Sequence, residues 1–296
     1  MRLLAATRGS ELARWQTDHV AGLLAPAAEV EAVVVETAGD RRLDVPIWEM
    51  GGKGVFVKEV QAAVLDGRAD LAVHSAKDLP SVPTPGLVIA CVPRRADPRD
   101  ALVGARLAEL PPGARVATGS VRRRAQLAWL RPDLTFAGLR GNIATRLGKV
   151  GGGVDAVVVA KAALDRLGLG DRADDVLSPV DLVPQVGQGA LAVECREGDE
   201  DVLAALRSVE DRASRVAVDA ERGFLAELGG SCDLPAGALA TVDGDGVTVE
   251  AVLATLDGRI VLRHRTAGPA ADPAAVGRAA ALHLLDRAGG RALLAG

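Results

Sequence analysis

The sequence predicts an α/β protein with two similar domains, followed by a small α+β domain with an antiparallel sheet. Short apolar runs typical of buried strands alternate with capped, amphipathic segments over residues 2–167. The strand-turn-cap pattern Ala6-Thr7-Arg8-Gly9-Ser10 returns as Ala117-Thr118-Gly119-Ser120, which indicates a repeat. Three strand-like runs separated by Asp-Gly turns, and then a helix, close the chain.

The first domain is expected to alternate strands and helices. Ser10 is the expected N-cap of the first helix, because its hydroxyl can accept from the unpaired N–H groups there. The expected elements are a strand over Arg2–Thr7, a helix over Glu11–Leu24, a strand over Val30–Thr37, a helix from about Phe56 to Leu65, and strands over Asp70–Val73 and near Leu87–Val92. This alternation predicts a mostly parallel sheet covered on both faces.

A polar, proline-containing break over residues 93–100 predicts a crossover into the second domain. Its expected elements are a strand over Arg115–Thr118, a helix from Ser120 to about Leu130, a strand over Thr135–Leu139, a helix over Ile143–Val150 capped by Asn142, a strand over Asp155–Ala160, and a helix to about Leu167. The glycine loop Pro184–Gly189 leads into a strand over Ala190–Cys195 that returns to the first domain, giving two crossovers and a hinge.

A helix over Val209–Leu228 should open the last domain. Strands over Gly237–Val242, Val247–Thr255 and Arg259–Arg265 and a helix over Pro273–Ala288 should follow. We therefore expect domain 1 to comprise residues 1–93 and 190–207, domain 2 residues 98–185, and domain 3 residues 210–296.

Composition excludes several classes of function. The net charge of −4 and the aromatic content of 2%, without tyrosine, argue against nucleic-acid binding. No apolar run is long enough to span a bilayer, and Arg8 interrupts the apolar start before a signal-peptide core forms, so we expect a cytoplasmic protein. The HExxH motif and paired metal-ligand spacings are absent, and no Walker A or dinucleotide fingerprint stands in the right context, so no metal or nucleotide is expected.

The three cysteines fall into two kinds. Cys91 and Cys195 lie in predicted strands and should be inert core residues. Cys232 lies in the turn Gly229-Gly230-Ser231-Cys232-Asp233, where it is either an incidental loop thiol or a functional one.

Two sets of polar residues follow predicted strands. Lys77 and Asp78 lie in the stretch His74–Pro80 that follows the strand over Asp70–Val73. Ligands bind just past such strand ends in open α/β sheets, although a solvated turn pair is the plainer alternative. Arginines occupy three strand-to-helix turns: Arg8, the run Arg122-Arg123-Arg124, and Arg140 with Arg146. Helix N-termini with added guanidinium groups favour carboxylates or phosphates, so a polyanionic ligand held between two domains is expected. Solvated helix-face arginines are the alternative, and it is retained for Arg124.

Several long motifs, in this order, resemble the hydroxymethylbilane synthase (porphobilinogen deaminase) family over nearly the whole chain. They are Ala6-Thr7-Arg8-Gly9-Ser10, Gly51-Gly52-Lys53-Gly54-Val55-Phe56-Val57-Lys58-Glu59, His74-Ser75-Ala76-Lys77-Asp78-Leu79-Pro80, Ser120-Val121-Arg122-Arg123, Leu139-Arg140-Gly141-Asn142, Thr145-Arg146-Leu147 and Val186-Gly187-Gln188-Gly189-Ala190.

The resemblance implies two domains like type II periplasmic binding proteins, plus a third domain. It implies condensation of four porphobilinogen molecules into hydroxymethylbilane with loss of ammonia, in tetrapyrrole biosynthesis. It also implies a dipyrromethane cofactor, made from substrate and held by a thioether to a cysteine that matches Cys232. A monomer is expected.

The resemblance also assigns roles to single residues. Asp78 matches the catalytic aspartate. Residues expected to bind the cofactor, besides Cys232, are Lys77, Ser120, Arg122, Arg123, Gly141 and Arg146. Residues expected to bind substrate are Arg8, Ser10, Arg140, Arg146 and Gln188.

The chain departs from the family pattern at Ser231, Gly119 and Ala38, which bears on details of carboxylate contacts. The alternative function is a two-domain solute-binding module without catalysis. That alternative predicts an export signal or a membrane tether and gives Cys232 and Asp78 no role.

Overall fold

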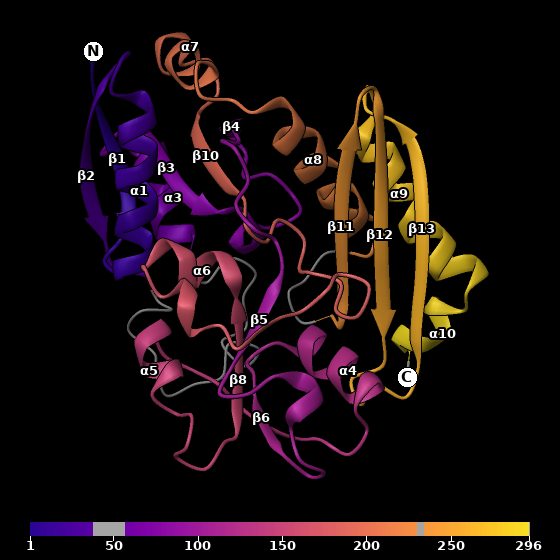
Figure 1. Ribbon diagram of the computed structural model, residues 1–296. Helices are drawn as coiled ribbons and strands as arrows, with labels where there is room; N and C mark the ends of the chain where they lie inside the picture. Colours follow the sequence, from indigo (N-terminus) through magenta and orange to yellow (C-terminus); the bar gives the residue numbers. More distant parts are fainter. Residues whose placement is uncertain (38–56, 230–233, 296) are drawn as a thin grey trace. The chain divides into compact units, whose positions relative to one another are not determined.

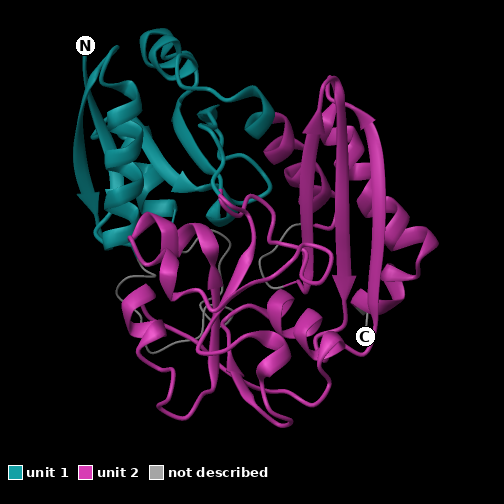
Figure 2. Ribbon diagram, in the orientation of Figure 1, with its two compact units in different colours: residues 1–96, 190–215 teal, residues 97–189, 216–296 magenta. Residues whose placement is uncertain are grey.

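The computed structural model describes residues 1–37, 57–229 and 234–295 and divides into two compact units. Unit 1 comprises residues 1–96 and 190–215, and unit 2 comprises residues 97–189 and 216–296 (Figure 2). The chain therefore passes between the units after Ala96, Gly189 and Arg215.

Unit 1 is built on a five-stranded sheet with the order β2-β1-β3-β10-β4 (Figure 1). Its strands are β1 (Arg2–Arg8), β2 (Glu29–Val35), β3 (Leu71–Ser75), β4 (Leu87–Cys91) and β10 (Leu191–Arg196). The first three strands are parallel, and β10 runs antiparallel to both of its neighbours.

Helices cover both faces of this sheet. They are α1 (Glu11–Leu24), α3 (Lys58–Leu65) and α7 (Glu200–Arg207). Alternate residues of a strand face opposite sides, so two apolar clusters form. Helices α1 and α7 pack on the face that presents Leu71, and α3 packs on the face that presents Ala72.

Unit 2 contains a second five-stranded sheet with the order β7-β6-β8-β5-β9. Its strands are β5 (Asp100–Val103), β6 (Arg115–Ala117), β7 (Thr135–Ala137), β8 (Ala156–Ala160) and β9 (Asp175–Val176), and its helices are α4 (Val121–Leu130), α5 (Ile143–Leu147) and α6 (Lys161–Arg166). Strands β7, β6 and β8 are parallel, and β5 is antiparallel to β8 and β9. This is the strand order and direction of the first sheet, so the predicted repeat is confirmed.

A three-stranded antiparallel sheet completes unit 2. It comprises β11 (Ala236–Asp243), β12 (Gly246–Ala254) and β13 (Val261–Pro269), with α8 (Arg212–Glu227), α9 (Pro273–Leu282), a π turn (His283–Arg287) and α10 (Gly290–Ala295). Phe224 of α8 is fully buried in the core that these elements share.

The predicted fold class is confirmed: two α/β sheets of like topology and a small antiparallel sheet. The larger sheets are mostly parallel, as expected, but in each of them one inserted strand, β10 or β5, runs against the other four. Two expectations were wrong in detail. Strand β5 begins at the end of the predicted break over residues 93–100, and the helix expected over Val209–Leu228 is shorter and follows the separate helix α7.

Candidate functional site

A small pocket of unit 1 lies where the parallel strands β1 and β3 end. It encloses about 60 Å³. The polar and ionisable side chains on its wall are those of Arg8, Ser10, Gln16, His74, Ser75 and Asp78. The structure thus brings Asp78 to the same pocket as Arg8 and Ser10, three residues that the sequence predicted for the site.

The local sequence positions each of these groups. Ser10 caps α1 by accepting from the Ala13 N–H at 3.3 Å, as predicted. Chain direction changes after β3 through a 3₁₀ turn, Ala76–Asp78, and the Ala76 N–H donates to the Ala190 carbonyl at 3.0 Å. Because this turn is tied to β10, the half-buried Lys77 and Asp78 sit on a fixed backbone rather than in a solvated loop.

Three of these pocket residues, Gln16, His74 and Ser75, were not among the predicted site residues. The Gln16 amide donates to the Ser75 hydroxyl at 2.9 Å, which joins α1 to the end of β3. His74 lies with Nε2 3.1 Å from Oε2 of Glu194, and the Gln61 amide donates to that same oxygen at 2.8 Å. The side chains of His74, Glu194 and Gln61 are all buried. A histidine inside an otherwise apolar strand is the sequence signal that could have marked this cluster.

In unit 2, two strand-to-helix turns lie side by side. Ser120 caps α4 and Asn142 caps α5. A Cβ on Gly119 would lie 2.7 Å from the Leu139 carbonyl oxygen, so the turns after β6 and β7 touch and a side chain at 119 has no room. This crowding gives a physical reason for glycine at that position.

Gly141 has a φ of +104°, a backbone conformation that favours glycine, and an added Cβ would also meet Thr145 at 2.8 Å. Its carbonyl accepts from Arg146 Nε at 2.7 Å. The structure therefore brings Gly141 and Arg146 together, beside the half-buried Arg140.

Arg122 and Arg123 are neither solvated nor aimed outward; their side chains are buried and converge on Asp100. Arg122 Nη2 lies 2.7 Å from Asp100 Oδ2, and Arg123 Nη2 lies 2.7 Å from Oδ1. The Gln188 amide also donates to Oδ1, at 2.8 Å. Three predicted site residues thus share one carboxylate that the sequence analysis did not single out, although a charged residue opening an apolar strand was a visible signal.

The remaining predictions concern one exposed arginine, two buried cysteines and three residues outside the described ranges. Arg124 is exposed over the ring of Phe136, at 5.9 Å, so the solvated alternative is confirmed for it. Burial raises the pKa of the Cys91 thiol to about 12 and that of Cys195 to about 11, which makes both inert as predicted. The predictions for Cys232, Ser231 and Ala38 lie outside the described residues.

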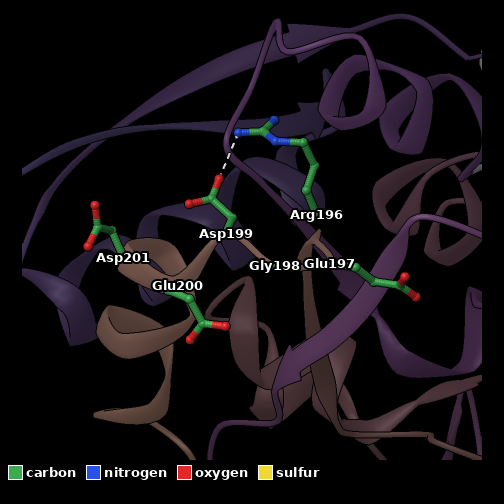
Figure 3. A pocket seen from close by; sticks show the side chains of 6 residues that line it. All are labelled: Arg196, Glu197, Gly198, Asp199, Glu200 and Asp201. Carbon is green, nitrogen blue, oxygen red and sulfur yellow. Dashed lines mark hydrogen bonds and ion pairs between the residues drawn. The ribbon is translucent and has the colours of Figure 1, made fainter.

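A larger hollow of about 470 Å³ lies on the turn between β10 and α7 and is a poor candidate site. Figure 3 shows Glu197, Glu200 and Asp201 pointing in different directions, while Arg196 reaches Asp199 at 2.9 Å. Arg196 also donates to the carbonyls of Val64 and Ala69, so it ties the sheet edge together. The acidic side chains at the rim of this hollow would repel an anionic ligand.

The described residues contain neither a metal-binding cluster nor a helix suited to a membrane. Within residues 1–37, 57–229 and 234–295, no cluster of three or more His, Cys, Asp or Glu side chains is arranged to hold a metal ion. In the same ranges, no helix combines the length and apolar character needed to cross a membrane.

The fold is that of an α/β protein with polar and arginine-bearing turns at its strand ends, where ligands bind in such folds. Residues 3–204 match the family model described as porphobilinogen deaminase, dipyromethane cofactor binding domain, and residues 216–286 match the porphobilinogen deaminase C-terminal domain. The chain is 51% identical to porphobilinogen deaminase of Roseiflexus castenholzii over 99% of both chains, and 46% identical to that of Syntrophotalea carbinolica over 99% of this chain and 95% of the relative. A YaeC-family lipoprotein structure from Enterococcus faecalis matches at a TM-score of 0.41 and 15% identity, over 71% of this chain and 91% of that one. The chain therefore belongs to the porphobilinogen deaminase family of transferases.

The residues of unit 2 fit an anionic group such as the family's dipyrromethane. Two buried guanidinium groups share the single carboxylate of Asp100, and Arg122 Nε is buried without a hydrogen-bond partner among the described residues. An unpaired buried donor and an excess of positive charge both favour a carboxylate ligand.

Proposed function

We propose that this chain condenses four porphobilinogen molecules head to tail onto a dipyrromethane held by Cys232, with loss of four ammonia. Hydrolysis by one water molecule then breaks the bond to the dipyrromethane and releases hydroxymethylbilane. Family membership supports the reaction. The structural observation that carries the residue assignment is the shared pocket of Asp78 and Arg8, at the carboxyl ends of parallel strands.

Asp78 is the catalytic group in this proposal. A carboxylate beside the pocket can stabilise the positive charge that develops as the amine leaves, and can accept and return a proton. Its position on a turn tied to β10 holds the carboxylate still, which general acid–base chemistry requires.

Arginines and small polar groups hold the carboxylates of substrate and cofactor. Arg8 and Ser10 lie in the pocket with Asp78, which supports a substrate role for both. The other substrate-binding residues are Arg140, Arg146 and Gln188. The cofactor-binding residues are Lys77, Ser120, Arg122, Arg123, Gly141 and Arg146, with Cys232 as the covalent anchor. The bound dipyrromethane supplies the nucleophilic pyrrole carbon to which the first substrate is added.

Three separate sheets support the proposed domain organisation. Residues 1–93 with 190–207, 98–185 and 210–296 form three domains in this proposal, each with its own sheet. The separate family model for residues 216–286 supports the third. We further propose a cytoplasmic monomer that binds neither nucleic acid nor a membrane. The net charge of −4 and the aromatic content of 2% support the absence of nucleic-acid binding.

The test is Asp78→Asn, compared with Asp66→Asn as a matched control on an exposed position of the same unit. We expect Asp78→Asn to fold, to carry the mass of one dipyrromethane, and to lose at least about 100-fold in turnover of porphobilinogen. Asp66→Asn should keep parental turnover. Equal turnover in both variants would remove the catalytic role of Asp78. A parent protein whose intact mass equals the sequence mass would instead favour the solute-binding alternative.

A further inference from the structure

Asp100 is the hub of a buried polar cluster in unit 2. It opens β5 and is fully buried. Oδ1 accepts from Arg123 Nε at 2.9 Å and from Gln188 Nε2 at 2.8 Å, and Oδ2 accepts from Arg122 Nη2 at 2.7 Å. A carboxylate has about four lone-pair sites, so Asp100 is nearly saturated by these side chains.

Each partner of Asp100 is fixed a second time by a backbone carbonyl. Arg122 Nη1 donates to Val183 at 2.6 Å, and Arg123 Nη1 donates to Val158 at 3.0 Å. The Gln188 amide donates to Pro98 at 2.7 Å as well. Two neighbouring helix residues point about 100° apart. Both guanidinium groups reach one carboxylate only because their long stems converge on it.

The charges of the cluster do not balance. Burial works to raise the pKa of the Asp100 carboxyl, but Arg122, Arg123 and the Gln188 hydrogen bond together lower it to about 2. Asp100 is therefore an anion at neutral pH and offsets one of two buried cations. Burial also lowers the pKa of the Arg122 guanidinium, although Asp100 opposes that shift.

The packing leaves little freedom at Arg122. A Cβ on Gly237 would come within 2.9 Å of Arg122 Cδ and 2.5 Å of the Pro184 carbonyl oxygen, so β11 lies directly against the stem of this arginine. The rotamer of Arg122 is set from one end by Asp100 and from the side by the small sheet.

We propose that Asp100 is a positioning residue for carboxylate binding: it holds Arg122, Arg123 and Gln188 in one geometry and leaves the cluster with one net positive charge for an anionic ligand. Asp100 acts through the arginines and does not itself touch the ligand, since its oxygens are occupied and of the wrong charge. The inference rests on the proposed function, in which Arg122 and Arg123 hold the dipyrromethane carboxylates.

The test compares Asp100→Glu, Asp100→Asn and the control Asp97→Asn, which removes a nearby aspartate that forms an ion pair with Arg99. Intact mass gives the fraction of purified chains that carries dipyrromethane. Thermal unfolding gives stability, and KM and kcat for porphobilinogen are measured on the loaded fraction. Asp100→Glu keeps the charge but moves the carboxylate by one methylene, so it isolates position from charge.

We expect folded Asp100→Glu to show at least a 5-fold lower loaded fraction or a 10-fold higher KM, with kcat within about 3-fold. Asp100→Asn should be worse in the same readouts, and Asp97→Asn should match the parent. A folded Asp100→Glu protein with parental loading and KM would overturn the inference, because a merely structural role would lower only the unfolding temperature.

If neither Asp100 variant folds, Gln188→Met provides the test. It removes one neutral contact of Asp100, so a smaller drop in the loaded fraction is expected, and an unchanged loaded fraction would overturn the inference. KM is not the readout for this variant, because Gln188 is itself proposed to bind substrate. A parent chain without the dipyrromethane mass would refute the proposed function instead, so the two failures are distinguishable.

Discussion

Glu221 offers a quantitative prediction about how the glycine loop Pro184–Gly189 is held. This α8 carboxylate is fully buried. Its Oε2 accepts from the Gly187 N–H at 2.6 Å, and its Oε1 accepts from the Ala240 N–H at 2.9 Å. One side chain thus joins the loop before β10 to the first strand of the small sheet.

Glu221→Gln keeps the shape but replaces one acceptor oxygen with a donor. One buried backbone N–H then faces an NH₂ group and loses its partner, which costs about 1–3 kcal/mol. The other hydrogen bond remains but is no longer charge-assisted. We therefore expect a loss of roughly 2 kcal/mol in local stability, which corresponds to about 30-fold faster amide exchange.

Hydrogen–deuterium exchange of peptides that cover residues 182–190 and 236–242 measures this change. Glu109→Gln is the matched control, because Glu109 is an exposed residue whose 3.9 Å pairing with Arg106 contributes little. Exchange in Glu221→Gln that stays within 3-fold of the parent at both peptides would refute the reasoning, since two buried amides cannot lose a charged acceptor without consequence.

Two further predictions concern packing and pH. Gly277→Ala should destabilise unit 2 by about 3 kcal/mol or more in urea unfolding, because the new Cβ would lie 1.8 Å from the Ala220 carbonyl oxygen. Gly22→Ala is the contrast: its Cβ meets nothing within 4 Å at an exposed position of α1, so it should stabilise by up to about 1 kcal/mol. If both substitutions changed the free energy of unfolding in the same direction, this reasoning would be contradicted. The rings of His264 and His283 stack with their centroids 3.5 Å apart. Burial, and to a lesser extent the charge of His283, lowers the pKa of His264 below 6.5. The unfolded chain therefore binds the proton more readily, so stability should fall as pH drops below about 6.5. The pH dependence of the unfolding temperature should be weaker in His283→Gln, and an unchanged slope would argue against this coupling.

Local signals predicted the repeated architecture well. The helix Glu11–Leu24 was predicted to the residue, and the caps Ser10, Ser120 and Asn142 accept as expected. These features depend on neighbours within a few positions, so the sequence contains them directly. The order and direction of the strands could not be predicted from such local signals. An antiparallel strand that returns from far along the chain leaves no pattern in its neighbours that shows which strand it will pair with.

The candidate site was predictable only in part, for the same reason. A strand end followed by Lys77-Asp78 was sufficient to suggest a site, and the structure places Asp78 and Arg8 on the wall of one pocket. The partner of Arg122 and Arg123 could not be predicted, because Asp100 lies 22 and 23 positions earlier and pairs with them only after β5 inserts beside β8. Long-range pairing therefore decides whether a helix-start arginine is solvated, as Arg124 is, or buried.

The two sheets of like topology present different groups at equivalent strand ends. In unit 1, β1 ends at Arg8 and β3 leads to Asp78, so a guanidinium and a carboxylate line one pocket. In unit 2, the equivalent strands β6 and β8 lead to Ser120 and to Lys161, which pairs with Asp165. Side chains just beyond a strand end can differ between the two sheets without changing the strand order, because the residues within the strands form the core. The repeat therefore decides where polar groups stand, but not which charge they carry.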